Sequence, residues 1–100
     1  MYLYANAYIC KMNMNKTNLA ITEYCQALND KLISKNIAYN NSIQNPVSIF
    51  NKGSKIDGIC ARLDDKINRI KSAGLTDATE DTIEDLIGYL IHLKIALNNE

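Results

Sequence analysis

The stretch from Arg62 to Leu90 decides the fold. It reads RLDDKINRI (62–70), KSAGLTDAT (71–79) and EDTIEDLIGYL (80–90). The outer segments carry apolar residues at helical spacing, and the polar segment between them is short. A short connection between two helices folds them back on each other, so the sequence predicts an antiparallel helix pair.

The first helix of this pair is predicted to begin after Gly53. Ser54, followed three residues later by Asp57, is typical of a capping box. Isoleucine and leucine then recur with the 3-4-4-3 spacing of a core-facing seam. The seam consists of Ile56, Ile59, Leu63, Ile67 and Ile70. Gly74 fits the position just beyond the end of this helix, where glycine is common.

The second helix of the pair is predicted to start near Asp77–Thr79 and to reach Asn98. It has a wide apolar face made of Ile83, Leu86, Ile87, Leu90, Ile91, Leu93 and Leu97. A stripe at the edge of that face consists of Asp81, Asp85, Gly88 and His92. A glycine in mid-helix costs about 1 kcal/mol against alanine, and its small size lets another backbone or a ligand approach closely.

A further helix is predicted upstream, from Thr17 or Asn18, which would cap it, to about Lys35. Its apolar stripe consists of Ile21, Cys25, Leu28 and Leu32. The connection 36–53 is long for so small a chain. Because it contains the apolar residues Ile43, Val47, Ile49 and Phe50, we expect it to pack over the helices, with a helical turn near Val47–Phe50.

These patterns predict an all-α fold with three main helices and a long loop between the first and second. Residues 17–100 would form a single small helical bundle. Residues 1–16 would be an N-terminal extension, either a short strand or disordered. The apolar faces are wide for a three-helix monomer, so we expect a homo-oligomer, most simply a homodimer.

Composition excludes several classes of protein. Eleven Lys and Arg balance eleven Asp and Glu, which is unusual for a general nucleic-acid-binding protein. The three cysteines are an odd number without CxxC spacing, which argues against a zinc site and a disulfide framework. No apolar run approaches the ~20 residues of a membrane span, and a basic signal region is lacking. A cytoplasmic protein is therefore expected.

The acidic residues at the start of the last helix are candidates for chemistry. Carboxylates at i, i+3 and i+4 project from one helix face and can hold Mg²⁺. The predicted metal ligands are Asp81, Glu84 and Asp85. The alternative is that acidic residues in a first turn, such as Glu80 and Asp81, only offset the helix dipole. Asp85 lies further into the helix and borders the apolar face, so the dipole explains it less well.

A basic set lies on the preceding helix. Arg62, Lys66 and Arg69 share one side, with Asp65 placed to pair with Arg69 at i, i+4. Arginine can grip phosphate oxygens, although the same residues could form a solvated face paired with carboxylates. We expect Arg62 and Arg69 to line one pocket with Tyr39, which could stack on a base. Lys35 and Asn36, a few residues before that tyrosine, could add polar contacts.

Three motifs resemble a known family. KNIAYNNS (35–42), RLDDKINRI (62–70) and EDTIEDLIGYL (80–90) are similar to the small phage proteins called nucleotide-modification-associated domain 1. The resemblance covers about residues 30–95 and extends more distantly to MazG-type all-α nucleoside triphosphate pyrophosphohydrolases. In those enzymes two acidic pairs hold magnesium against a triphosphate, and the last pair precedes a D-x-x-x-Y-L run. Asp85, Tyr89 and Leu90 match that run. The resemblance therefore adds Asp85 and Tyr89, together with Asp65, to the residues expected to bind a nucleotide.

The chain departs from the enzyme pattern in its acidic pairs. Thr82 stands where the paired glutamate is expected, and the first helix offers Glu23 without an ExxE motif. The resemblance therefore implies nucleotide binding without hydrolysis, for example of a signalling nucleotide of host defence, in the cytoplasm of a bacterial host. The alternatives are a Mg²⁺-dependent pyrophosphohydrolase, using Asp64 or Asp65 to complete the metal site, and a structural helical module that binds a protein partner.

Overall fold

A computed structural model describes residues 15–99 of the chain. These residues contain the α-helices α2 (Lys16–Ala38), α3 (Lys55–Ala73) and α4 (Glu80–Asn98), with the short 3₁₀-helix η1 (Asp77–Thr79) and no strand. The predicted all-α fold with three main helices is confirmed. Of the predicted N-terminal extension, residues 1–14 lie outside the described part.

The chain divides into two compact units, with the boundary inside α2 between Lys31 and Leu32. In the first unit, the side chain of Asn15 caps α2 by accepting a hydrogen bond from the backbone N–H of Asn18 at 2.8 Å. The prediction that Thr17 or Asn18 would be the cap is therefore wrong. Asn15 can serve equally well, because asparagine is among the favoured N-cap residues.

The second unit begins with the last turns of α2, which continue to Ala38 rather than ending near Lys35. A Schellman motif ends the helix: Asn41 N–H bonds to Asn36 C=O at 3.0 Å, and Asn40 N–H bonds to Ile37 C=O at 3.1 Å. Asn40 has φ 54°, the left-handed conformation that this motif requires and that asparagine tolerates. The asparagine pair thus stops the helix where glycine would otherwise be expected.

Helix α3 begins and ends where local sequence signals place it. Ser54 Oγ accepts a hydrogen bond from the backbone N–H of Asp57 at 3.1 Å. At the other end Gly74 has φ 80°, and its N–H donates to Ile70 C=O at 2.7 Å. Both predicted boundaries are confirmed, because each depends on residues within one helical turn.

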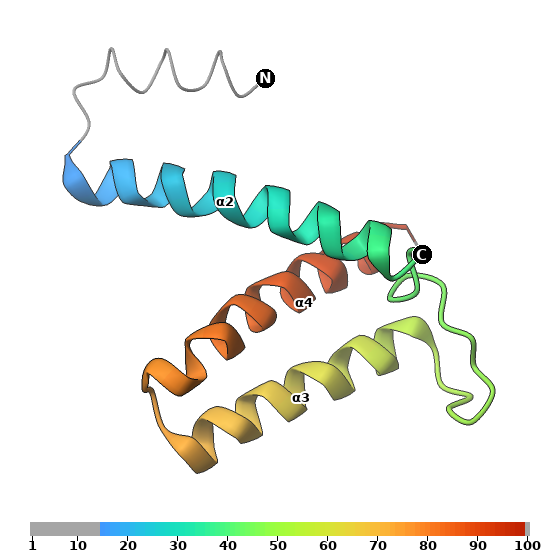
Figure 1. Cartoon of the computed structure of the whole chain (residues 1–100). Helices are drawn as coiled ribbons and strands as arrows, with labels where there is room; N and C mark the ends of the chain where they lie inside the picture. Colours follow the sequence, from blue (N-terminus) through green and yellow to red (C-terminus); the bar gives the residue numbers. More distant parts are fainter. Residues whose placement is uncertain (1–14, 100) are drawn as a thin grey trace. The chain divides into compact units, whose positions relative to one another are not determined.

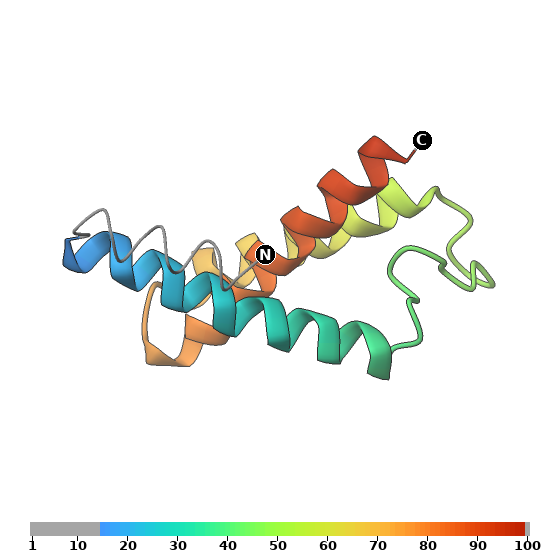
Figure 2. The same cartoon turned by 90° about the horizontal axis from the view of Figure 1, so that it is seen from above.

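Helices α3 and α4 lie side by side and run in opposite directions (Figure 1, Figure 2). The core between them contains the buried Ile59, Leu63 and Ala96. Partly buried neighbours complete it: Ile43, Ile56, Leu86, Tyr89 and Leu93. In the turn that joins the helices, the buried Thr79 hydroxyl accepts from Thr76 N–H at 2.9 Å and lies 2.8 Å from Gly74 C=O, to which it can donate. The predicted antiparallel pair is therefore present.

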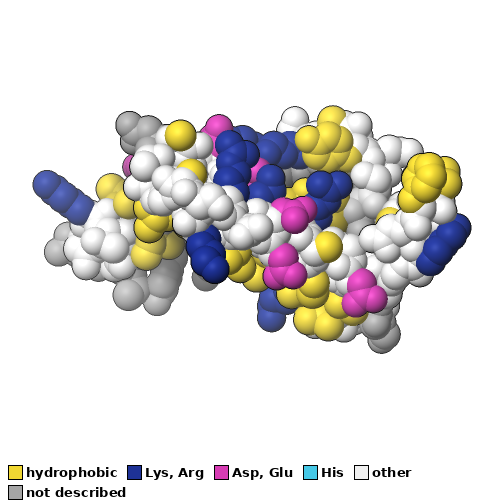
Figure 3. Space-filling model, turned by 90° about the horizontal axis from the view of Figure 1, so that it is seen from below, with side chains coloured by type: hydrophobic (Ala, Val, Ile, Leu, Met, Phe, Trp, Pro, Cys, Tyr) yellow, Lys and Arg dark blue, Asp and Glu magenta, His cyan; other side chains and the backbone are white. Residues whose placement is uncertain are grey.

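The core uses only part of the predicted apolar stripes. Ile67 of the α3 seam is 55% exposed. Several residues of the predicted α4 face are also 40–57% exposed, namely Ile83, Ile87, Leu90, Ile91 and Leu97. Figure 3 shows hydrophobic side chains at the surface among basic and acidic ones. Homo-oligomerisation, which would cover such residues, stays a prediction from the sequence.

The connection between α2 and α3 is irregular. Residues 39–44 form turns, and no helical turn follows near Val47–Phe50. Val47, Ile49 and Phe50 are 76%, 64% and 97% exposed, so the prediction that the loop packs over the helices is wrong for these three side chains. The prediction is confirmed for Ile43, which packs against the core near the start of the loop.

Candidate functional site

Asp85 of α4 is the centre of an ion-pair cluster. Its carboxylate lies 3.1 Å from Nζ of Lys66 on α3 and 3.5 Å from Nζ of Lys35 in the last turn of α2. The side chains of Asp85 and Lys66 are about three-quarters buried, with 27% and 24% of their surface exposed. Two lysines and one carboxylate leave a formal charge of +1. The cluster can therefore hold an additional negative group.

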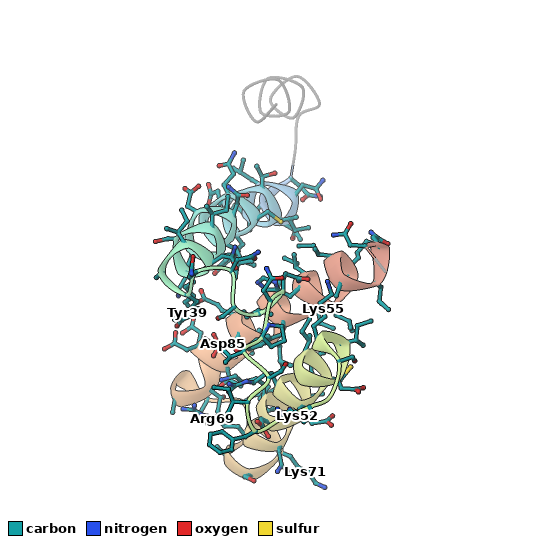
Figure 4. All side chains as sticks on the ribbon, turned by 90° about the vertical axis from the view of Figure 1, so that its right-hand side faces the viewer. Tyr39, Lys52, Lys55, Arg69, Lys71 and Asp85 are labelled. Carbon is teal, nitrogen blue, oxygen red and sulfur yellow. The ribbon has the colours of Figure 1, made fainter. Side chains whose placement is uncertain are left out.

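A hollow of about 200 Å³ opens at this cluster. We call it the charged pocket, and it is lined by Leu32, Lys35, Asn36, Tyr39, Ile43, Lys66, Asp85, Gly88, Tyr89 and His92. All of these residues belong to the second unit. Figure 4 labels Tyr39 and Asp85, which belong to this lining. Lys71, also labelled there, projects from the last turn of α3, away from both. Six predicted binding residues are therefore brought together: Lys35, Asn36, Tyr39, Lys66, Asp85 and Tyr89.

Gly88 explains how Leu32 can reach the wall of the charged pocket. A Cβ atom added to Gly88 would lie 2.8 Å from Leu32 Cδ2, closer than two such carbons tolerate. The sequence predicted that a small residue here would allow a close approach, and the approaching group is the Leu32 side chain. A larger residue at position 88 would displace that side chain or fill the hollow.

His92 is the last residue of α4 that lines the charged pocket, and it contacts Gln44 of the loop between α2 and α3. Gln44 Nε2 lies 3.0 Å from both His92 Nδ1 and His92 C=O. Since a carbonyl only accepts, the nitrogen of the Gln44 amide must face His92, and its second hydrogen is donated to Nδ1. This arrangement suits the neutral ring of His92 with its proton on Nε2, because Nδ1 then accepts from Gln44. Partial burial also lowers the pKa of His92 below its ordinary value of 6.5.

This arrangement predicts acid sensitivity. Unfolded chains protonate His92 at about pH 6.5, but the folded protein does so only at lower pH, because partial burial disfavours the charged imidazolium and so lowers the pKa of His92. Below about pH 6.5 the unfolded state binds more protons, so the free energy of unfolding should fall from about pH 7 to pH 5. Urea unfolding across this range would measure it. His92→Asn should flatten that part of the profile, and an identical slope in both proteins would contradict the assignment.

A larger hollow of about 800 Å³ lies between the connecting loop and α3. We call it the loop groove. Its lining includes Val47, Ile49, Phe50, Arg62 and Asp65, and it shares Tyr39, Ile43 and Tyr89 with the charged pocket. Arg62 and Asp65 thus lie in the neighbouring groove, and Arg69 lines neither hollow. Of the pocket predicted from Arg62, Arg69 and Tyr39, the structure places Arg62 and Tyr39 in the loop groove and leaves Arg69 out of its lining.

The acidic residues of α4 are not grouped as a metal site. Within residues 15–99 no three His, Cys, Asp or Glu side chains lie close enough together to hold a metal ion. Asp81 is exposed, and Asp85 faces lysines. Thr82, at the position where the enzyme pattern has glutamate, is 1% exposed. A glutamate there would be buried, so position 82 does not present a carboxylate to the charged pocket.

Sequence reasoning missed Gln44 and assigned no role to His92. The stripe of Asp85, Gly88 and His92 was a usable signal, because residues spaced by three and four share one side of a helix. Gln44 gave no comparable signal, since it lies in an irregular loop 48 residues from its partner.

No helix in residues 15–99 has the length and apolar character needed to cross a membrane. No protein-family model matches the chain, and searches of curated proteins and of solved structures found no significant match either. The chemistry of the charged pocket is therefore the basis on which a function is proposed.

Proposed function

We propose that the protein binds a phosphate-bearing nucleotide in the charged pocket and holds it without cleaving it. The observation that carries the proposal is the convergence of Lys35 and Lys66, from two different helices, on Asp85 beside two tyrosines. The resemblance of the three sequence motifs to nucleotide-associated phage proteins agrees with this chemistry.

The lysines supply the attraction for phosphate. An ammonium group is a compact point charge with three donors, and lysine is a common phosphate ligand. Lys66 is mostly buried, so its charge is screened less by salt than that of a surface lysine. Asp85 fixes both ammonium groups in place and keeps the empty pocket from carrying two unpaired cations.

The tyrosines supply a surface for a base. Tyr39 is 55% exposed and Tyr89 is partly buried, and both rings line the two neighbouring hollows. Stacking of a base on an aromatic ring contributes roughly 1–3 kcal/mol. A nucleotide can therefore place its phosphate at the lysines and its base against a tyrosine within one connected site.

Binding without turnover is favoured over hydrolysis by the placement of the acidic residues. Pyrophosphohydrolysis in the related enzyme pattern uses paired carboxylates that hold Mg²⁺. In the described part of this chain, Asp85 is paired with cations and position 82 is a buried threonine. Asp85, the carboxylate in the lining of the charged pocket, positions the two lysines.

Isothermal titration with a panel of nucleoside mono- and triphosphates, in Mg²⁺ and in EDTA, tests the proposal. We expect saturable binding that persists in EDTA, with the nucleotide recovered intact. Release of pyrophosphate in Mg²⁺ would identify a hydrolase instead. The absence of binding for every member of the panel would favour the alternative of a protein-interaction module.

Asp85→Asn tests the role of the carboxylate. We expect nucleotide affinity to fall about tenfold, because both lysines lose the charged group that positions them. Stability should fall by less than about 1 kcal/mol, because asparagine has the same size as aspartate and keeps an oxygen that both lysines can donate to. Calorimetry and thermal melting measure the two effects. Tighter binding by the variant would show that Asp85 mainly repels the phosphate, and a loss of several kcal/mol would show a structural role.

A further inference from the structure

The charged pocket is small for a nucleotide and adjoins a larger hollow. Its volume is about 200 Å³, whereas pockets that enclose organic ligands usually measure about 300–1,000 Å³. The loop groove, of about 800 Å³, shares the side chains of Tyr39, Ile43 and Tyr89 with it, and both hollows lie within the second unit. A ligand held by Lys35 and Lys66 therefore has room to extend past the two tyrosines into the loop groove.

The loop groove has a positive charge of its own. The charged side chains in its lining are Lys55, Arg62 and Asp65, which leave a formal charge of +1. Arg62 is exposed, and its side chain makes no ion pair or hydrogen bond with any other residue in the part of the chain that the structure describes. Arginine can bind phosphate oxygens through two parallel hydrogen bonds. The groove can thus hold a second phosphate, besides the one at Lys66.

Arg62 and Lys66 are spaced for two phosphates of one nucleotide chain. They are four residues apart in α3, so they share one side of the helix and lie about 6 Å apart along its axis. Successive phosphates of a nucleotide chain are separated by the atoms of one sugar, which is a comparable span. The two phosphates of a nucleoside diphosphate share an oxygen atom and lie much closer together. The spacing therefore favours phosphates on successive nucleotides.

An exposed aromatic ring is available for a second base. Phe50 is 97% exposed and belongs to the lining of the loop groove. Aromatic side chains stack on any base, because every base has a π-face. Tyr39 and Tyr89 provide such a surface for the first base. Each hollow therefore combines cationic side chains with an aromatic one.

We propose that the ligand is a dinucleotide with a 5′-phosphate, which carries two phosphates and two bases. Its 5′-phosphate binds at Lys35 and Lys66, its phosphodiester binds at Arg62, and its second base stacks on Phe50. This inference rests on the proposed function and adds the class of nucleotide. The same chemistry occurs at the 5′ end of a longer strand, so the test includes one.

Four adenine nucleotides test the inference by calorimetric titration in EDTA: the 5′-monophosphate, the 5′-diphosphate, the 5′-phosphorylated dinucleotide and the 5′-phosphorylated tetranucleotide. We expect the dinucleotide to bind at least about tenfold more tightly than the mono- or diphosphate, because it alone of these three places two phosphates one sugar apart. A mono- or diphosphate that binds as tightly as the dinucleotide would overturn the inference and leave nucleotide binding intact. If none of the four binds, the inference and the proposed function fail together.

The tetranucleotide distinguishes the two sources of this chemistry. Binding at least as tight as that of the dinucleotide would identify the end of a strand as the ligand. Weaker binding would identify a free dinucleotide.

Variants of exposed residues complete the test. Arg62→Met and Phe50→Ala should each weaken binding of the dinucleotide by about threefold to tenfold and leave the affinity for the monophosphate unchanged. Arg69→Met is the control, because it removes the same charge from the same helix at a residue that lines neither hollow. It should keep the preference, and none of the three changes should shift the thermal midpoint. A preference that survives Arg62→Met, or one that Arg69→Met reduces equally, would contradict the proposed second phosphate site.

Discussion

Replacing Ile59 with alanine is expected to lower the free energy of unfolding by about 3 kcal/mol. Ile59 is 1% exposed and lies at the centre of the small core between α3 and α4. Removing its outer carbons leaves a cavity that a small, well-packed core cannot fill by relaxing. Because small domains have a total stability of only about 5–15 kcal/mol, this change should be visible as a large drop in melting temperature.

Ile67→Ala is the matched control. It removes the same atoms from the same helix, two turns further on, at a site that is 55% exposed. We expect a loss below about 1 kcal/mol. Chemical denaturation of both variants measures the comparison. Equal losses would mean that Ile67 is covered in solution, as the predicted self-association would require, and a small loss for Ile59→Ala would contradict the described core.

Replacing Lys66 with methionine is expected to weaken nucleotide binding by about tenfold to a hundredfold. Methionine keeps most of the apolar stem of lysine but removes the ammonium group that lies 3.1 Å from Asp85. A hydrogen bond to a charged group contributes roughly 1.5–3 kcal/mol, which corresponds to this range of affinity. Asp85 keeps its contact with Lys35, so stability should change much less than affinity.

Lys71→Met is the control for charge alone. Lys71 lies on the same helix, at its exposed end, and lines neither hollow (Figure 4). Both variants change the net charge of the protein equally, so a general electrostatic effect on a nucleotide would weaken binding equally in both. Calorimetry in the same salt should show a loss only for Lys66→Met. Equal affinities in the two variants would show that Lys66 does not bind the nucleotide directly.

The parts of the fold that were predictable depend on local interactions. Ser54 and Gly74 mark the ends of α3 because a capping residue acts on backbone groups within one turn. The end of α2 was placed too early because the Asn40–Asn41 turn, rather than the last apolar residue of the stripe, stops the helix. Exposure of Phe50 could not be predicted, since an apolar loop sequence does not show what the loop contacts.

The extent of the core was harder to predict than its position. A periodic apolar stripe shows which side of a helix can be buried, but not how much of it a partner covers. Ile59 and Ile67 occupy equivalent positions in the α3 pattern, yet one is buried and the other is half exposed. The spacing of apolar residues in α3 alone therefore does not distinguish the two positions.

The site was partly predictable. The sequence singled out Lys66 and Asp85 separately, as a phosphate-binding and a metal-binding candidate, and the helix pair brings them to 3.1 Å from each other. Arg69 was assigned to the same pocket from its position on the helix, but it lies outside the lining. The contact between Gln44 and His92 depends on the path of an irregular loop, which no periodic pattern records.

Amide chemical-shift mapping by NMR tests nucleotide binding at the charged pocket most directly. The isotope-labelled protein would be titrated with adenosine 5′-monophosphate in EDTA, and the shifted amides assigned. Binding as proposed predicts saturable shifts that cluster at Lys35–Tyr39, around Lys66, and along Asp85–His92, with Lys71 unaffected. The absence of saturable shifts, or shifts confined to residues that line neither the charged pocket nor the loop groove, would contradict it.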